Sequence, residues 1–158
     1  MTTPESRLRR VITSTLPKLE AITDHDASLP RAPGKWSRKE IVGHLIDSAS
    51  NNHQRFVRAQ FTNDLIFPGY DQDAWVSVQR YGIAPWSSLV TLFAEFNLHL
   101  ARVIESIPSD VRTHARMRHN LYEIAFTQIP AGEPTTLEYF MGDYVVHLEH
   151  HLAQIFEG

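Results

Sequence analysis

Apolar residues recur at steps of three and four along the segment that follows Pro134. This spacing is typical of an amphipathic helix, and Pro134 cannot extend that helix backwards because proline lacks a backbone N–H. Thr135 and Glu138 have the spacing of a capping box, which predicts that the helix begins there and continues to the end of the chain. Its predicted apolar stripe consists of Leu137, Phe140, Met141, Tyr144, Val145, Leu148, Leu152 and Ile155.

Two histidines, His147 and His151, lie beside this stripe and are four residues apart. Side chains with that spacing lie one helical turn apart on the same face, so both imidazoles can point at one metal ion. His150 projects to the other side of His147, and we expect it to face solvent. A third ligand would have to come from another part of the chain.

The composition restricts the chemistry that is open to the chain. Its 158 residues include 9 histidines and no cysteine, which excludes disulfides, thiolate zinc sites and a cysteine nucleophile. The net charge is −3 and the basic residues are dispersed, so we expect no nucleic-acid partner. No apolar run approaches the ~18 residues of a membrane span. Residues 1–10 lack an apolar signal core, and we therefore expect one cytoplasmic domain over residues 1–158 with no membrane partner.

Three further segments have the pattern of long amphipathic helices. The first opens at Thr3 and Pro4, and Pro17 should kink it or end it near Leu16. The second opens at a capping box of Ser37 and Glu40 and should run to about Phe61. The third starts at Pro85, and its predicted inner stripe is Leu89, Leu92, Phe93, Phe96, Leu100, Val103, Ile104 and Ile107.

The connections between these helices are long. We predict a linker over residues 24–35 and an irregular connection over residues 63–84, in which Tyr70, Trp75 and Tyr81 pack inward. Residues 108–133 should contain a short helical turn and a packed segment. The chain is therefore predicted to be an all-α four-helix bundle, with long connections between helices 2 and 3 and between helices 3 and 4.

A polar line follows the core face of the second predicted helix. It consists of His44, Ser48, Asn51 and Arg55, spaced by four, three and four residues. The line is either the wet face of the helix or the border of a pocket inside the bundle. The sequence has no Glu-x-x-His motif and no His-Glu-x-x-His motif, which argues against a di-iron bundle and a zincin protease. It also lacks a Gly-rich phosphate loop and a Gly-x-Ser-x-Gly elbow.

Three segments, in the same order, resemble the DinB-like (YfiT-like) superfamily, which is described as metal-dependent enzymes. They are residues 35–48, which include Lys35-Trp36-Ser37 and Gly43-His44-Leu45-Ile46-Asp47-Ser48, residues 68–75 (Pro-Gly-Tyr-Asp-Gln-Asp-Ala-Trp) and residues 147–155. The resemblance implies a four-helix bundle with one divalent ion on three histidines, which here fall on His44, His147 and His151. Three neutral imidazoles leave a position for water or substrate. Zinc or nickel is the expected metal, with iron as a further candidate.

The resemblance implies a hydrolase or a thiol transferase that acts on a small molecule, with metal-activated water or a low-molecular-weight thiol cosubstrate as the nucleophile. It also implies a homodimer. Asp47 would orient a ligand or a bound water, or would be a surface carboxylate. Asn51 and Arg55 would meet a polar or anionic substrate, or would be solvated. The alternative function is a non-enzymatic binding or dimerisation module with incidental metal binding.

Overall fold

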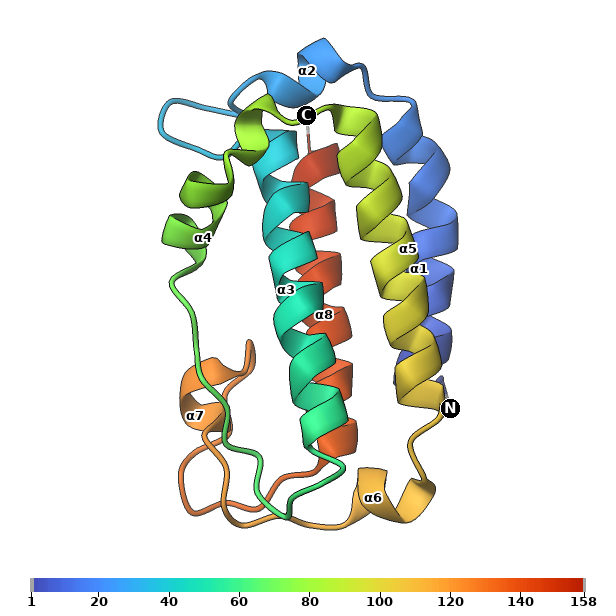
Figure 1. Cartoon of the computed structure of the whole chain (residues 1–158), viewed down its shortest axis with the longest axis vertical. Helices are drawn as coiled ribbons and strands as arrows, with labels where there is room; N and C mark the ends of the chain where they lie inside the picture. The colour runs from blue at the N-terminus through green and yellow to red at the C-terminus, as the bar shows by residue number, and fades with distance from the viewer. Residues whose placement is uncertain (1, 158) are drawn as a thin grey trace.

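Residues 2–157 of the computed structural model form four long helices with shorter helical segments in the connections (Figure 1). The prediction of an all-α four-helix bundle is confirmed. The long helices are α1 (Pro4–Glu20), α3 (Arg38–Arg58), α5 (Trp86–Glu105) and α8 (Leu137–Phe156). The shorter segments are α2 (Asp24–Ser28), α4 (Gln72–Gln79), η1 (Tyr81–Ile83), α6 (Ser109–Thr113) and α7 (Leu121–Ile124). None of the helices in this described part is long and apolar enough to cross a membrane.

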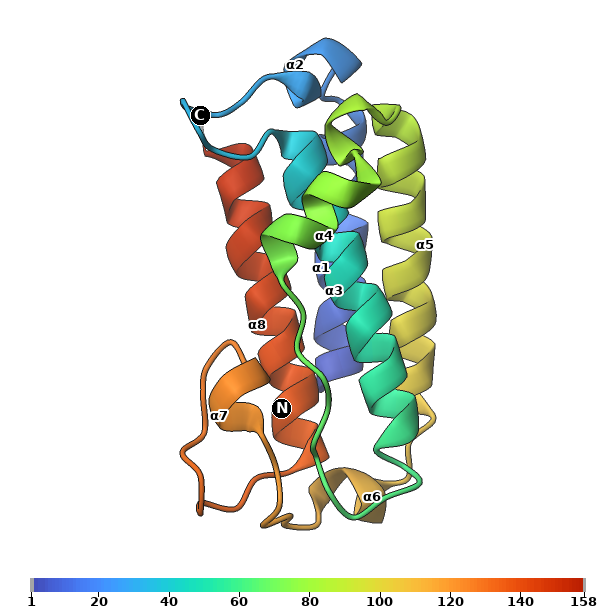
Figure 2. The ribbon, with the colours of Figure 1, turned by 60° about the vertical axis from the view of Figure 1, so that its left-hand side comes forward.

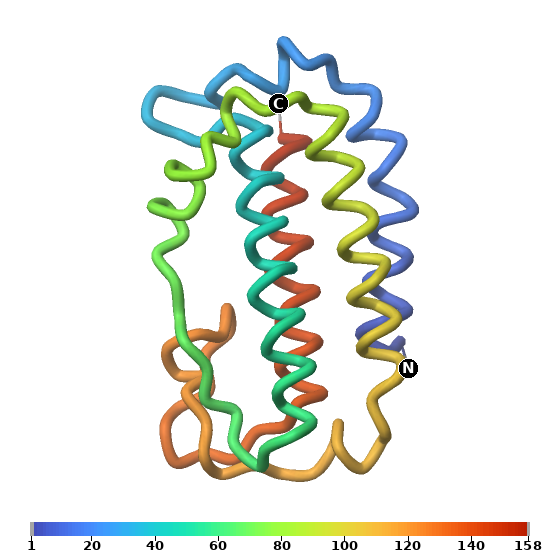
Figure 3. Tube along the Cα trace, viewed as in Figure 1, coloured from blue at the N-terminus to red at the C-terminus, as the bar shows by residue number. Residues whose placement is uncertain are grey.

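The four long helices form a ring in which α1 packs against α5 and α8, and α3 packs against the same two helices. Helices α3 and α5 run in one direction, while α1 and α8 run in the other (Figures 1 and 3). Because α3 and α5 are parallel neighbours, residues 59–85 must return along the length of the bundle. They do so outside α3 and carry α4 with them (Figure 2). The long connection between α5 and α8 carries α6 and α7.

The start of α3 is fixed by the predicted capping box. Ser37 Oγ accepts a hydrogen bond from the Glu40 backbone N–H at 3.2 Å, and a Glu40 carboxylate oxygen accepts one from the Ser37 N–H at 3.1 Å. These bonds satisfy two of the free donors at the helix N-terminus. The helix ends at Arg58 rather than near Phe61, and residues 59 and 60 form a turn.

Of the two effects predicted for Pro17, an end of the helix near Leu16 is wrong. The helix continues through Pro17 to Glu20. The carbonyl that loses its helical donor belongs to the exposed Thr13, where water can replace the missing bond. The last turn is also held by Leu19, which is fully buried and whose carbonyl accepts a hydrogen bond from Trp86 Nε1 at 2.9 Å.

The predicted N-cap of the last helix is wrong by one residue. Thr136, not Thr135, accepts the capping hydrogen bond, from the Tyr139 backbone N–H at 3.0 Å. The Thr135 backbone instead exchanges hydrogen bonds with Arg116 at 2.8 and 3.1 Å. The Glu138 carboxylate is engaged by Arg112. The hydrogen bonds between the backbones of Thr135 and Arg116 therefore explain why α8 starts one residue later than the sequence predicts.

The connections contain more helix than the sequence patterns indicated. Thr23 caps α2 inside the predicted linker, and Asp71 caps α4 inside the predicted irregular connection. Of the three aromatic residues expected to pack inward there, Tyr81 is buried and Tyr70 is half-buried, but Trp75 is 37% exposed. Leu92, expected in the inner stripe of the third helix, is 48% exposed.

Candidate metal centre

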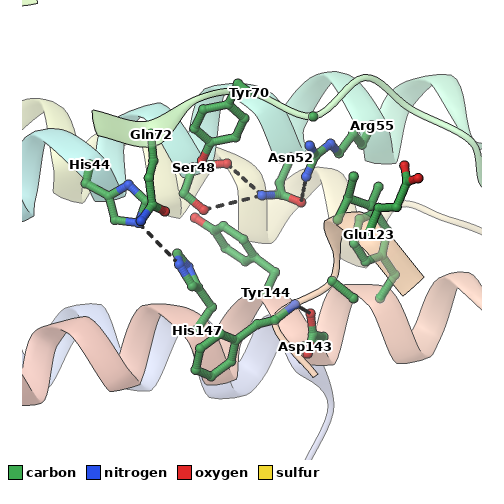
Figure 4. Close-up of a pocket in the computed structure, with 15 residues that line it drawn as sticks. His44, Ser48, Asn52, Arg55, Tyr70, Gln72, Glu123, Asp143, Tyr144 and His147 are labelled. Carbon is green, nitrogen blue, oxygen red and sulfur yellow. Dashed lines mark hydrogen bonds between the residues drawn. The ribbon is translucent and has the colours of Figure 1, made fainter. Parts of the chain in front are cut away.

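Three histidines from two antiparallel helices meet where α3 packs against α8, on the side covered by the returning connection and the loop after α7. Because α3 and α8 run in opposite directions, the first half of α3 lies beside the second half of α8 (Figure 1). His44 of α3 therefore faces His147 and His151 of α8, and their possible ligand atoms all lie within 4.8 Å of one another. The Nε2 atoms of His44 and His147 are 3.3 Å apart (Figure 4). The His151 ring centroid is 4.7 Å from that of His44 and 4.6 Å from that of His147.

These separations are suited to a single ion. A tetrahedral ion with metal–nitrogen bonds of about 2.0–2.1 Å holds its ligand nitrogens about 3.3–3.4 Å apart. The His44–His147 pair already has this spacing. Side-chain movements of about 1 Å would bring the third imidazole to the same distance. Three imidazoles are a donor set suited to zinc, nickel, iron or copper, so the residues present fit a divalent ion.

Burial keeps the three imidazoles neutral. It lowers the pKa of His44 to about 4, with a smaller contribution from the nearby His151. It lowers the pKa of His147 to about 3, with contributions from His151, His44 and His150. Burial also lowers the pKa of His151, against a hydrogen bond to Gln154 that raises it. Neutral imidazole is the form that binds metal, so no proton has to be displaced near neutral pH.

The neighbouring residues orient the rings. His151 Nδ1 lies 3.0 Å from Gln154 Oε1, which leaves Nε2 of this ring free for the cluster. His44 is 1% exposed and packs against the Trp36 ring with centroids 5.1 Å apart. Its Nδ1 is buried and has no hydrogen-bond partner among residues 2–157. With the proton on Nδ1, the ring presents its lone pair at Nε2, toward His147.

Cavities lie on both sides of the cluster. One, of about 310 Å³, is lined by His44 and His147 and extends along α3 toward Arg55 (Figure 4). The other, of about 550 Å³, is more open and is lined by His151. Gln72, the first residue of α4, lines both. The three histidines therefore line two cavities that small molecules can enter.

Two of the four predicted pocket residues, Ser48 and Arg55, line the smaller cavity, and the structure places Asp47 and Asn51 outside this lining. The Asn51 amide donates to the Asp47 backbone carbonyl at 2.9 Å. Asn52 takes the place expected for Asn51. One residue along a helix corresponds to a rotation of about 100°, so the two asparagines face different surroundings.

The Asp47 carboxylate connects α3 to the returning connection. Its Oδ1 accepts hydrogen bonds from the Tyr81 hydroxyl at 2.7 Å and from Gln79 Nε2 at 2.8 Å. Burial raises the pKa of Asp47, while these two hydrogen bonds act in the opposite direction. Asp47 therefore holds η1 and the end of α4 against the helix that carries His44.

Further residues of the smaller cavity were missed by reasoning from sequence. Asp143 lies four residues before His147, and its carboxylate accepts backbone hydrogen bonds from Phe126 and Thr127, both at 2.8 Å. It thereby fixes the loop after α7 beside the cavity. Tyr144 lines the cavity and donates a hydrogen bond to Asn97. The position of Asp143 one turn before His147 was a signal that could have revealed it.

The remaining histidines lie outside the cluster. His25, His99, His114 and His150 are exposed. His53 packs beside His99 with ring centroids 5.3 Å apart. His119 lies 2.6 Å from the Glu133 carbonyl oxygen through its Nε2. Among residues 2–157, only His44, His147 and His151 form a group of three metal-ligating side chains.

Comparison with known proteins agrees with this arrangement. The family model of the DinB superfamily matches residues 7–155. The chain belongs to the DinB superfamily. It is 27% identical over 139 residues to YfiT of Bacillus subtilis (strain 168), covering 88% of this chain and 72% of that protein. It is 24% identical over 134 residues to a Bacillus licheniformis protein, covering 85% of this chain and 70% of the relative. Both relatives are named as candidate metal-dependent hydrolases.

The fold of this DinB superfamily chain is similar to a solved structure of YfiT from Bacillus subtilis. The two align with a TM-score of 0.74 at 24% sequence identity, over 97% of this chain and 84% of the other. The solved protein is described as "a probable metal-dependent hydrolase with an unusual four-helix bundle topology". The parallel arrangement of α3 and α5, which needs a connection along the whole bundle, is therefore shared with a known fold.

Proposed function

We propose that this DinB superfamily chain is a metal-dependent hydrolase of a small-molecule substrate, with one divalent ion on His44, His147 and His151. The observation that carries the proposal is the meeting of three neutral imidazoles, one buried and two half-buried, at the edge of two cavities, with the Nε2 atoms of His44 and His147 3.3 Å apart. Zinc or nickel is the preferred ion, followed by iron. The names of the relatives support the same reaction class.

A divalent ion on three histidines supplies Lewis acidity and lowers the pKa of a bound water or thiol. The residues of the chain bind and orient the substrate. Ser48 and Asn52 offer polar groups along the α3 wall, and Tyr70 and Phe126 place rings around the cavity that exclude water. Asp143 holds the Phe126 loop in place through two backbone hydrogen bonds.

Transfer of a low-molecular-weight thiol is the second candidate function. It is favoured by the presence of a cavity on each side of the histidine cluster, because a transferase must bring two molecules to one point. The chain has no cysteine of its own, so the thiol would arrive on a cosubstrate.

Metal analysis of protein purified without a histidine tag tests the proposal. We expect one divalent ion per chain, bound in a form that His44→Ala removes while the helical circular dichroism spectrum is retained. His53→Ala is the matched control, since His53 lies on the same helix but outside the cluster. A wild-type protein without bound metal, or one that loses it equally in both variants, would support the non-enzymatic binding module.

Activity assays on the metal-loaded protein then separate the two reactions. A hydrolase cleaves ester or amide substrates in the absence of thiol. A transferase consumes an electrophile only when a thiol is added. Loss of either activity in His44→Ala but not in His53→Ala would assign it to the cluster.

A further inference from the structure

The end of the smaller cavity opposite the histidines contains a buried arginine that forms no ion pair with residues 2–157. Arg55 is 6% exposed and lines the cavity. It donates to the Pro68 carbonyl at 3.0 Å and more weakly to Asn52 Oδ1 at 3.5 Å. None of the carboxylates in residues 2–157 forms an ion pair with it. A guanidinium carries five N–H donors, so most of its donor capacity is unused.

Two aromatic rings lie beside this charge. The guanidinium carbon lies 6.0 Å from the centroid of the Tyr70 ring and 5.9 Å from that of Phe140. Ring contacts of this kind stabilise a cation only modestly. A buried charge without an opposite charge is unfavourable, so an anion bound at this place would be strongly favoured.

Two other arginines of the interior, Arg112 and Arg116, have more hydrogen-bond or ion-pair partners than Arg55. Arg112 is engaged by two carboxylates, those of Glu5 and Glu138. Arg116 donates to three backbone carbonyls, including that of Val111, and bridges the end of α3 and the loop before α8. Arg116, like Arg55, has no carboxylate partner among residues 2–157 and lines a cavity, but that cavity contains none of the three cluster histidines, whereas Arg55 shares its cavity with His44 and His147.

Arg55 and His44 lie along one face of α3. Ser48 and Asn52 lie between His44 and Arg55 on α3, and all four side chains line the cavity. The eleven residues from His44 to Arg55 span about 16 Å of helix axis. Side chains on a helix lean toward its N-terminus, so the Arg55 side chain extends back toward His44. Figure 4 shows the two at opposite ends of the cavity.

We propose that Arg55, with Ser48, Asn52 and Tyr70 around it, binds a carboxylate of the substrate while the reacting group lies at the histidines. A carboxylate is favoured over a phosphate because Glu123 and Asp143 line the same cavity. Those two acids repel a singly charged carboxylate less than a doubly charged phosphate, and Arg55 supplies the one opposing charge. This inference rests on the proposed function for the position of the reacting group, but not for the carboxylate site itself.

Isothermal titration calorimetry with a bifunctional probe tests the inference. The probe is mercaptohexanoate, whose thiolate is a ligand for zinc, and its neutral counterpart is mercaptohexanamide. With zinc-loaded protein we expect the acid to bind roughly 10- to 100-fold more tightly than the amide, as for a charge-assisted hydrogen-bonded pair. Arg55→Gln should abolish this preference and leave amide binding and zinc content unchanged.

Two further variants keep the test decisive. Arg58→Gln removes the same charge from an exposed position one turn away and should retain the full preference. Arg55→Lys keeps the charge without the planar pair of donors, and should retain only part of it even if Arg55→Gln does not fold.

The outcomes separate this inference from the proposed function. Equal binding of acid and amide to the zinc-loaded wild type would overturn the carboxylate site while the metal site stands. If the protein binds none of zinc, nickel and iron, the proposed function fails, and hexanoate and hexanamide then decide the carboxylate site alone. A preference for hexanoate that depends on Arg55 would support the inference, and its absence would overturn it.

Discussion

Replacing Gly43 by alanine tests how the returning connection packs against α3 next to His44. A Cβ at Gly43 would lie 2.2 Å from both Cγ and Cδ2 of the Tyr81 ring and 2.7 Å from Cε2. Ordinary contacts begin at 3.4 Å, so the rigid ring would have to move by about 1.2 Å. That movement would also disturb the hydrogen bond from the Tyr81 hydroxyl to the buried Asp47 carboxylate.

The expected change in the free energy of unfolding combines two costs and one gain. Overpacking of an interior costs about 1–3 kcal/mol. Loss of a hydrogen bond to a buried charged group costs about 1.5–3 kcal/mol. Alanine in a helix interior is favoured over glycine by about 0.8–1.0 kcal/mol. We therefore expect Gly43→Ala to lower the free energy of unfolding by about 1.5–5 kcal/mol.

Gly142 of α8 is the matched control, because a Cβ built there has nothing within 4 Å. There only the helix preference acts, so Gly142→Ala should raise the free energy of unfolding by about 0.8–1.0 kcal/mol, or the melting temperature by roughly 2–4 °C. Urea unfolding followed by circular dichroism measures both variants. In a Tyr81→Ala background, the cost of Gly43→Ala should disappear. If Gly43→Ala is as stabilising as Gly142→Ala, Tyr81 does not pack against α3 as described and the reasoning is refuted.

Three further predictions concern charge and metal. The metal-free protein should lose stability as the pH falls from about 6.5 toward 4. In the folded chain the pKa values of His44 and His147 are about 4 and about 3, so these rings stay largely neutral in that range. In the unfolded chain the same histidines take up protons there, which favours unfolding. Each histidine contributes up to about 1.4 kcal/mol per pH unit in urea titrations, and a flat profile would contradict the buried, neutral cluster. Arg112→Met should lower the free energy of unfolding by about 3–5 kcal/mol, because it leaves the carboxylates of Glu5 and Glu138 without their shared partner. A loss below about 1 kcal/mol would contradict a stabilising role of these two ion pairs. Removal of bound zinc with a chelator should lower the melting temperature of the wild type but not that of His44→Ala, and an equal shift in both would argue against this site.

The sequence alone determined the features that depend on neighbours within a few residues. The capping box of Ser37 and Glu40 needs only side chains three positions apart, so it was recognisable before any fold was known. The pairing of His147 and His151 on one face follows from the helical period. Their meeting with His44 was different, since it came from the family resemblance and not from the periodicity.

The tertiary structure decided what depends on direction and on the packing of distant segments. It selected Thr136 over Thr135 as the N-cap of α8, because the Thr135 backbone is bonded to Arg116. It placed Asn52, not Asn51, at the cavity, and it buried Arg55 there beyond ion-pair distance of the carboxylates in residues 2–157. A helical period fixes which residues share a face, but the rotation of that face and the neighbours it meets depend on how the helices pack. In this chain α3 runs parallel to α5 and antiparallel to α8. These contacts determine the rotation of each helix and its neighbours, and so they bring the three histidines together.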